Sequence, residues 1–251
     1  MSTINNILNT FEPITLSEMD SVKLLDRMDT KFTFNASKLP AFLNELKNDY
    51  KALDVCGIQM SRYETLYFDT PNLELYIKHH NGKQNRYKVR YRKYADSNIN
   101  FFEVKFKTNK GRTIKNRVKR TEIHEEIQGK STNLLNEKTP LQAELLKPVL
   151  WIYYTRITLV NKHSAERLTL DLNLNYKHDN DEIAYPALVI AEVKQDKSGT
   201  SPFISLMRKN HISDVSISKY CFGIISLYKG IKKNNFKEKL IEINKICHGN
   251  N

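Results

Sequence analysis

The chain has 251 residues and a mass of 29.4 kDa, which is enough to bury a core without disulfides or a structural metal. No segment approaches the roughly 18 apolar residues of a membrane span, and the three scattered cysteines, with no C-x-x-C, argue against a zinc ribbon or a disulfide framework. Lys and Arg number 40 against 28 Asp and Glu, and this net charge of +12 indicates a polyanionic partner.

The first residues lack the basic and then apolar order of a signal peptide, so we expect a soluble, cytoplasmic protein without a transmembrane segment. In chain order, apolar periodicity predicts a strand over 28–34, a helix over 38–50, a strand over 59–69, a helix over 71–80, strands over 85–94, 100–108 and 112–122, a helix over 133–147, strands over 150–160, 166–176 and 187–195, and helices over 202–210 and about 218–247, where Gly230 could break the last.

These elements predict a single α+β domain over residues 1–251, with a core over about 24–230 and helical extensions at both ends. Most of the eight strands follow one another through short polar turns. We therefore expect an antiparallel eight-stranded β-barrel with helices packed outside it and a helix at the C-terminus.

Charged residues fall on one face of nearly every predicted strand, because alternate side chains of a strand point to opposite faces. The residues that share such faces are Arg27, Asp29 and Lys31; Lys88, Arg90 and Arg92; Glu103, Lys105 and Lys107; Lys115, Arg117 and Lys119; Tyr154 and Arg156; Arg167, Thr169 and Asp171; and Glu192 and Lys194. The opposite faces are apolar, as in Phe102, Val104 and Phe106 or Leu168, Leu170 and Leu172.

For a single strand, this pattern is typical of a half-buried sheet with a solvated charged face. Seven such strands, rich in Arg and accompanied by amphipathic helices that need an apolar surface, favour the inverse arrangement. The helices would cover the outside of the barrel, and the charges would line its lumen. Many like charges in a confined space are costly unless a polyanion neutralises them.

Several segments resemble the VTC domain, the polyphosphate polymerase branch of the triphosphate tunnel metalloenzymes, from about Leu24 to Gly230. They are R-M-D-T-K-F (27–32), Y-E-T-L-Y-F-D-T (63–70), H-N-G-K-Q-N-R-Y-K-V-R-Y-R (80–92), F-E-V-K (102–105), G-R-T-I-K-N-R (111–117), Y-Y-T-R (153–156), R-L-T-L-D (167–171), A-E-V-K (191–194) and S-K-Y-C-F-G (218–223). Their joint order and spacing carry the resemblance.

The resemblance implies a phosphate-binding tunnel that uses a divalent metal, Mn²⁺ or Mg²⁺. By position, the implied phosphate-binding residues are Lys31, Arg90, Arg92, Lys105, Lys115, Arg117, Arg156, Arg167 and Lys219. Arg90, Arg92, Arg156, Arg167 and Lys219 are also the implied catalytic residues, and Glu192 is the implied metal ligand.

One departure bears on the reaction. Many tunnel phosphohydrolases begin with E-x-E-x-K, whereas this chain has R-M-D-T-K, so that Arg27 replaces a carboxylate. The four candidate acids in the tunnel are Asp29, Glu103, Asp171 and Glu192, against at least nine bases. This ratio favours holding a long phosphate chain over hydrolysing a short one, since hydrolysis needs acids that hold metal and position water.

The sequence thus predicts a metal-dependent phosphotransferase that moves the γ-phosphate of ATP to a growing polyphosphate chain. Two alternatives remain open: a tunnel triphosphatase acting on tripolyphosphate or a nucleoside triphosphate, and a non-catalytic module that binds polyphosphate or another phosphate polyanion. A fourth interpretation, nucleic-acid binding through Tyr87, Tyr91 and Tyr94, is disfavoured, because these tyrosines fit better as outer-face or rim packing. The histidines are scattered and are expected to be structural or exposed.

Overall fold

The computed structural model describes residues 2–21, 27–196 and 200–248, and the predicted core start at Leu24 lies outside these ranges. The strands are β1 (Pro13–Ile14), β2 (Arg27–Asn35), β3 (Tyr50–Leu53), β4 (Met60–Asp69), β5 (Arg86–Tyr94), β6 (Ile99–Lys107), β7 (Thr113–Arg120), β8 (Lys147–Asn161), β9 (Glu166–His178), β10 (Asp181–Tyr185) and β11 (Leu188–Asp196). The helices are α1 (Ser2–Leu8), α2 (Leu16–Ser21), α3 (Leu39–Leu46), α4 (Glu74–His80), α5 (Lys130–Lys138), α6 (Pro202–Lys209), α7 (Lys219–Leu227) and α8 (Lys237–His248), with 3₁₀ turns η1 (Ala36–Lys38), η2 (Ala143–Leu145) and η3 (Asn234–Phe236).

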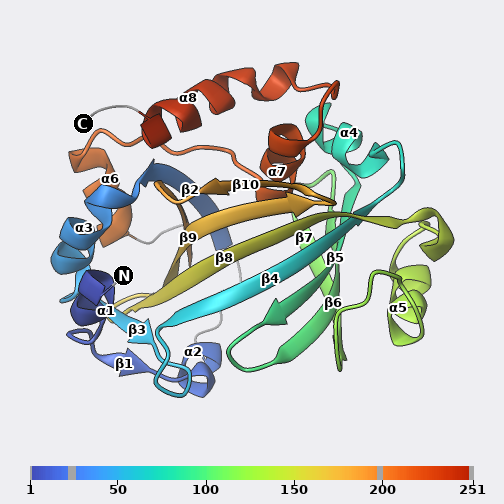
Figure 1. Ribbon diagram of the computed structural model, residues 1–251. Coiled ribbons are helices and arrows are strands. Elements are labelled where there is room, and N and C mark those ends of the chain that lie inside the picture. Colours follow the sequence, from blue (N-terminus) through green and yellow to red (C-terminus); the bar gives the residue numbers. More distant parts are fainter. Residues whose placement is uncertain (1, 22–26, 197–199, 249–251) are drawn as a thin grey trace.

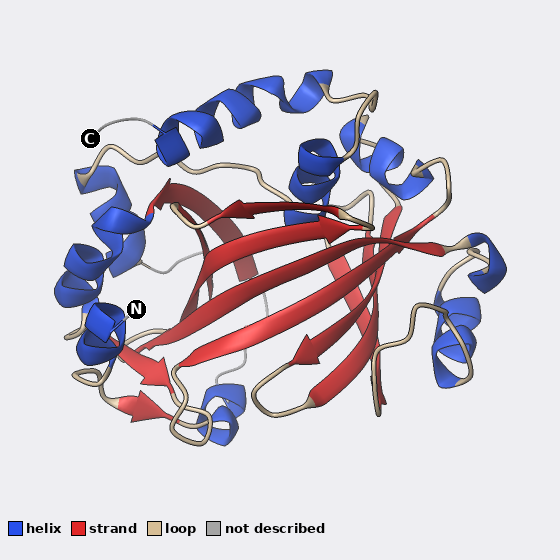
Figure 2. Cartoon of the chain, in the orientation of Figure 1, coloured by secondary structure: helices blue, strands red, loops and turns tan. Residues whose placement is uncertain are grey.

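A strongly curved sheet forms the centre of the molecule, and helices lie around its outside (Figure 1, Figure 2). Its main path runs β2-β11-β9-β8-β4-β5-β6-β7, with every neighbouring pair antiparallel. These eight strands are the eight that the sequence predicts. The short strands β1, β3 and β10, which it does not predict, join the sheet at its margins.

The word barrel applies only loosely, because the sheet is open between β2 and β7 in the described part of the chain. The segment after α6 occupies the outer edge of β2. There, the backbone N–H of Val215 donates to the carbonyl of Lys31 at 2.7 Å, and Asp214 bridges to Phe32. The segment thus lies along part of the edge of β2 that no strand covers in the described chain.

Three predicted helices end earlier than the sequence pattern suggests. The first ends at Leu46, because Tyr50 and the residues after it form β3. The helix predicted over 133–147 stops at Lys138, just before Pro140, and β8 begins at Lys147. The C-terminal pattern divides into α7 and α8 around Gly230, whose φ of 70° no helix can accommodate. No helix in the described ranges has the length and apolar character needed to cross a membrane.

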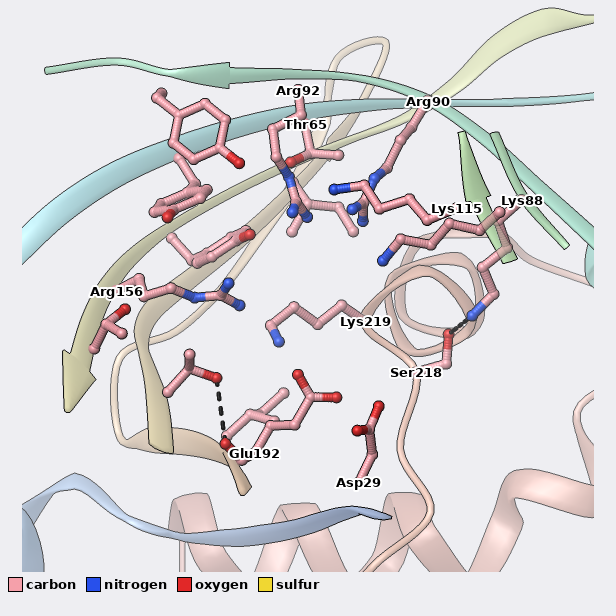
Figure 3. A pocket seen from close by; sticks show the side chains of 18 of the residues that line it. Asp29, Thr65, Lys88, Arg90, Arg92, Lys115, Arg156, Glu192, Ser218 and Lys219 are labelled. Atoms are coloured by element: carbon pink, nitrogen blue, oxygen red, sulfur yellow. Dashed lines mark hydrogen bonds between the residues drawn. The ribbon is translucent and has the colours of Figure 1, made fainter. Parts of the chain in front are cut away.

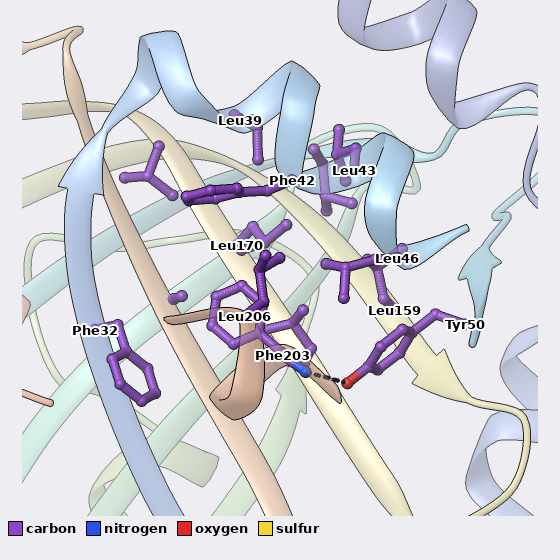
Figure 4. Close-up of a cluster of buried hydrophobic side chains, with 14 of the residues drawn as sticks. Phe32, Leu39, Phe42, Leu43, Leu46, Tyr50, Leu159, Leu170, Phe203 and Leu206 are labelled. Carbon is purple, nitrogen blue, oxygen red and sulfur yellow. Dashed lines mark hydrogen bonds between the residues drawn. The ribbon is translucent and has the colours of Figure 1, made fainter. Parts of the chain in front are cut away.

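The apolar outer faces of the strands pack under the helices, as the inverted pattern predicts. One cluster joins α3 and α6 to β2, β9 and β11 (Figure 4). In it, the hydroxyl of Tyr50 donates to the buried Glu166 and accepts from the backbone N–H of Phe203. A second cluster packs α7 against β8, β9 and β10 and includes Ile243 of α8; it lies on the concave side of the sheet, because Tyr63, Tyr67 and Tyr154 belong to it and also line the cavity described below. A third cluster places α5 over the outer faces of β5 and β6. Because the apolar faces are used outside, the charged faces turn inward.

The close approach of α7 to the sheet depends on Gly223. A Cβ atom at this position would lie 2.4 Å from Tyr176 Cδ1 and 2.6 Å from Leu150 Cδ2. Neither ring nor methyl group can move far, since Tyr176 and Leu150 are both buried in the second cluster. The helix that carries Lys219 is therefore positioned by a residue without a side chain.

We expect Gly223→Ala to lower the free energy of unfolding by about 1–3 kcal/mol, because the added methyl group overpacks the contact between helix and sheet. Urea unfolding of both proteins measures this change. An unaltered midpoint would contradict the assigned role of Gly223 in seating α7.

Candidate functional site

A cavity of about 890 Å³ lies against the concave face of the sheet, and all ten predicted site residues line it. They come from seven strands and the start of α7: Lys31 from β2, Arg90 and Arg92 from β5, Lys105 from β6, Lys115 and Arg117 from β7, Arg156 from β8, Arg167 from β9, Glu192 from β11 and Lys219 from α7. Figure 3 shows many of these side chains converging on one space. Their location follows from the inward face of each strand, whereas their binding and catalytic roles stay predictions.

A row of three lysines crosses one half of the cavity. Lys88, Lys105 and Lys115 are direct neighbours on β5, β6 and β7. Like charges in directly opposed positions destabilise a sheet. The nearby Arg90, together with burial and Arg92, holds the pKa of Lys105 well below its usual value. Burial also lowers the pKa of Lys88 and of Lys115. An anion in this half of the cavity would relieve the repulsion.

Glu103 holds Arg90, its direct neighbour on β5. Its side chain is fully buried, and its Oε2 accepts from Arg90 Nε at 2.7 Å and from Arg90 Nη2 at 2.5 Å, while Lys115 contacts Oε1 at 2.5 Å. Although burial alone would raise the pKa of Glu103, Arg90, Arg92 and Lys115 lower it. Arg90 Nη1 also donates to Tyr67 at 2.7 Å. Glu103 therefore positions Arg90 and Lys115 from behind.

Asp171 has the same role in the other half of the cavity. Its two oxygens accept from Arg156 Nε at 2.6 Å and from Nη2 at 2.8 Å, and Lys219 also contacts Oδ2. The carboxylate is buried behind these two cations. Burial would raise the pKa of Asp171, but Arg156 and Lys219 lower it. The forked contact leaves the Nη1 edge of Arg156 for a ligand.

Arg92 differs from these anchored arginines. Its guanidinium lies over the ring of Tyr63, 5.6 Å from the centroid, and its buried Nε has no hydrogen-bond partner in the described structure. Two neighbouring hydroxyl groups, Thr65 Oγ1 and Tyr154 Oη, are likewise buried without partners among the described residues. All three side chains line the cavity. Unpaired buried polar groups are rare in native proteins, so this corner is suited to a polar ligand.

Glu192 lies between two lysines, with Lys31 Nζ at 3.3 Å and Lys194 in direct contact. Burial would raise the pKa of Glu192, whereas Lys194 and Lys31 lower it, so the carboxylate is ionised. Lys194 also lies 3.7 Å from Asp29, and both carboxylates point into the same space (Figure 3). Within the described ranges, no group of three or more His, Cys, Asp and Glu side chains could hold a metal ion by itself.

This donor set nevertheless fits one kind of metal site. Mg²⁺ is commonly bound through one or two carboxylates, with water and substrate phosphates supplying the remaining ligands. Glu192 and Asp29 could provide the carboxylate oxygens on the wall opposite the lysine row. Arg27 stands where many tunnel phosphohydrolases have a carboxylate; its backbone begins β2, and its side chain is not among those that the structure describes.

The start of α7 brings a further part of the cavity wall into place. Ser218 caps the helix by accepting from the N–H of Cys221 at 3.4 Å, and it also accepts from Lys88 Nζ at 2.9 Å. This contact ties the helix to β5. Lys219 follows at the first helical position and points toward Asp171 and the Tyr154 ring, 5.4 Å from the ring centroid.

The remaining two predicted cations lie at the margins of the cavity. Arg117 is positioned over the ring of Phe101, 4.4 Å from the centroid, and Arg167 Nη1 is 3.9 Å from Met19 Sδ. His79 also lines the wall, but burial and the nearby cations, Lys88 first among them, lower its pKa to about 2. A neutral His79 contacting Cys221 at 3.0 Å is structural, as expected for the histidines.

Several lining residues are absent from the predicted set. They are Lys88 and Lys194, which share faces with predicted residues, and Tyr63, Tyr67 and Tyr154, whose strand positions have inward parity. Tyr94 is also at the rim of the cavity, whereas Tyr87 and Tyr91 pack on the outer face. Alternation identifies these inward positions. It does not show that the rings of Tyr63 and Tyr154 stack, with their centroids 5.0 Å apart, or that Arg92 and Arg156 both lie over Tyr63.

Removing the middle charge of the lysine row should stabilise the protein without ligand. We expect Lys105→Met to raise the free energy of unfolding by about 1 kcal/mol, or the midpoint of thermal unfolding by about 2–4 °C. The stabilisation that added tripolyphosphate gives should shrink in the same variant. Lys93→Met is the matched control, since Lys93 is on the outer face of β5 and pairs with Glu64 at 3.6 Å. Loss of stability in Lys105→Met would contradict the repulsion.

No curated protein matches the sequence. Similar solved structures include candidate adenylate cyclases from Vibrio parahaemolyticus (13% identity, TM-score 0.47, covering 79% of this chain and 99% of that chain) and Bacillus halodurans (15%, 0.49, 77% and 94%). A candidate adenylyl cyclase from Hippeastrum, described as having a dominant triphosphatase activity, is similar at 13% identity and a TM-score of 0.48, covering 81% and 98%.

These structural likenesses are distant and assign no activity. The VTC domain, in contrast, matches residues 26–228, and this range includes all eight strands of the main path. Helix α8 lies beyond the matched range. The chain belongs to the VTC domain family, within the CYTH-like tunnel superfamily.

Proposed function

We propose that the protein is a phosphotransferase that moves the γ-phosphate of ATP onto the end of a growing polyphosphate chain, with a divalent metal ion. The observation that carries the proposal is the charge arrangement in the cavity. Glu103 and Asp171 are buried behind the cations that they position, while the lysine row of β5–β7 faces the cavity. Such a surface favours a multiply charged anion that extends past a single triphosphate.

The reaction needs little from the protein beyond position and charge. A terminal phosphate oxygen of the chain would form the new P–O bond to the γ-phosphorus, and the bond between that phosphorus and the β–γ bridging oxygen would break. The electron pair stays on the β-phosphate of ADP. Because the attacking oxygen is already anionic, no general base is required, which agrees with a neutral, structurally engaged His79.

The arginines would stabilise the transferred group. Arg90 and Arg156 are each held by a buried carboxylate, so their free edges are fixed before a ligand arrives. Preorganised donors of this kind avoid a reorganisation cost during the reaction. Arg92 would add donors that have no competing partner at its Nε. Glu192 and Asp29 would hold the divalent ion, which would neutralise part of the triphosphate charge.

The deciding experiment is incubation of the purified protein with ATP and Mn²⁺ or Mg²⁺. The proposal expects long-chain phosphate and ADP as products, with one phosphate added to the chain for each ADP released. Release of inorganic phosphate without polymer would instead indicate a triphosphatase. Binding of polyphosphate without any turnover would indicate a non-catalytic module.

In this assay we expect Arg92→Lys to reduce turnover by about tenfold or more, because lysine keeps the charge but loses the planar fork. Loss of a charge-assisted contact is worth about 1.5–3 kcal/mol, which corresponds to such a factor. Arg208→Lys on the exposed side of α6 is the matched control. Full turnover in Arg92→Lys would show that only a diffuse positive field is needed.

The metal assignment predicts a different result for Glu192→Gln. Metal-dependent turnover should be lost, whereas tripolyphosphate should still bind, since the substitution removes a negative charge from a basic cavity. A titration of activity against Mn²⁺ compares this variant with the wild type. Glu45→Gln, which breaks the exposed pair with Lys209, serves as the control. An unchanged metal response together with lower thermal stability would show that Glu192 forms ion pairs with Lys31 and Lys194 and does not bind the metal.

A further inference from the structure

Strand β7 ends the main path of the sheet, and within the described chain it pairs with β6 alone. At the turn between these two strands, the N–H of Thr108 donates to the carbonyl of Arg112 at 2.9 Å. In an antiparallel pair, residues that exchange hydrogen bonds alternate with residues whose N–H and carbonyl groups point away from the partner strand. Counting in twos from Arg112, the residues whose backbone groups point away from β6 are Thr113, Lys115, Arg117 and Lys119.

This edge of β7 is open to the surroundings. The four residues that present backbone groups along it are all exposed. The chain that follows β7 does not cover the edge, because it turns back across the outer face of the sheet. There, the Tyr91 hydroxyl donates to the carbonyl of Glu126 at 3.3 Å, and Ile127 is buried in the cluster under α5. An edge with unpaired N–H and carbonyl groups can accept a further strand.

The charges of β7 determine which strand the edge can accept. The strand has no acidic residue and four cations, which are Lys115, Arg117, Lys119 and Arg120. If β7 paired with β7 of a second copy about a two-fold axis at Arg117, each Lys115 would lie opposite a Lys119. Like charges in directly opposed positions destabilise a sheet. The edge therefore disfavours a second copy and favours a strand with acidic side chains.

The outer face of β7 adds a second requirement. Ile114 has 50% of its surface exposed, and Val118 is partly buried against the cluster under α5. Both lie on the face opposite that of Lys115 and Arg117, because alternate side chains of a strand point to opposite faces. In an added strand, the residues between the acids would lie beside Ile114 and Val118. Apolar residues at these positions would cover the exposed part of Ile114.

We propose that β7 is a docking edge for a protein partner, which adds an antiparallel strand of alternating acidic and apolar residues. The acidic side chains would lie opposite Lys115, Arg117 and Lys119, and the backbone of the partner would supply the missing hydrogen bonds. The antiparallel direction continues the pairing of every neighbouring strand in the main path. Since Lys115 and Arg117 also line the cavity, a bound strand would compete with a phosphate anion for them.

The pairing is tested with a fluorescent seven-residue peptide of alternating Glu and Val, with Glu at both ends and both termini blocked. Its binding to the full chain is measured by anisotropy, in EDTA and without nucleotide. In the proposed pairing, the N–H groups of the Glu residues point to β7, and those of the Val residues point away. N-methylation of the Glu residues should therefore weaken binding by about tenfold or more, while N-methylation of the Val residues changes it by less than about threefold.

The charge pairing is tested by exchanging one pair of charges. In an antiparallel arrangement, the first Glu of the peptide lies opposite Lys119. Lys119→Glu should weaken binding by about fivefold, and a peptide whose first Glu is replaced by Lys should restore it to within about twofold. Lys177→Glu is the matched control, since Lys177 is an exposed lysine on β9 and should leave binding of both peptides unchanged.

Four results would overturn the proposal. They are no binding at about 1 mM peptide, equal binding of a peptide of the same composition with its Glu residues grouped together, an equal or greater loss on N-methylation of the Val residues, and a wild-type dimer that excludes the peptide. The last of these would assign the edge to a second copy. All measurements are made without turnover, so the outcome of the polymerase assay does not affect them.

Discussion

The arrangement of this molecule depends on a repulsion that its own fold imposes. Lys88, Lys105 and Lys115 are held in one row across three strands, with two arginines close by. Backbone hydrogen bonds fix the row, and the apolar faces of the same strands, buried under α5, prevent it from turning outward. An anion that entered the cavity would offset the cost of this repulsion. Under the proposed function, stability without ligand and affinity for phosphate would therefore be opposed properties of the same three side chains.

Two buried carboxylates, Glu103 and Asp171, offset the repulsion among the other cations of the cavity. Glu103 and Asp171 each contact one arginine and one lysine, and both lie behind the surface that a ligand would reach. Removing either would leave its cations unpaired in a low-dielectric setting, which is strongly destabilising. Glu192 lies instead on the wall, where Lys31 and Lys194 flank it. The four acids thus divide into two that position cations, Glu103 and Asp171, and two on the wall, Glu192 and Asp29, whose oxygens would suit a metal ion.

Helix α7 packs on the concave side of the sheet and borders the cavity. Its apolar residues and Gly223 pack against Tyr176 and Leu150, while its first residues, Ser218 and Lys219, contact Lys88 and Asp171 from the two halves of the sheet. The open edge between β2 and β7 needs such a connection, because no strand pairing in the described chain joins the two sides there. The first residues of α7 therefore connect the two charged walls of the cavity.

The sequence by itself determined the strands and which way each faces. The alternation of charged and apolar residues specified all eight main strands and placed residues as far apart as Lys31 and Glu192 at one cavity, because a period of two allows only two faces. Local pattern could not determine that the sheet stays open, since that depends on Val215 occupying the edge of β2. Nor could it assign partners: Glu103 and Glu192 occur in the same E-V-K motif, yet one is fully buried against Arg90 and the other lines the wall. Register and curvature decided between them, because only the tertiary structure sets which cations surround each carboxylate.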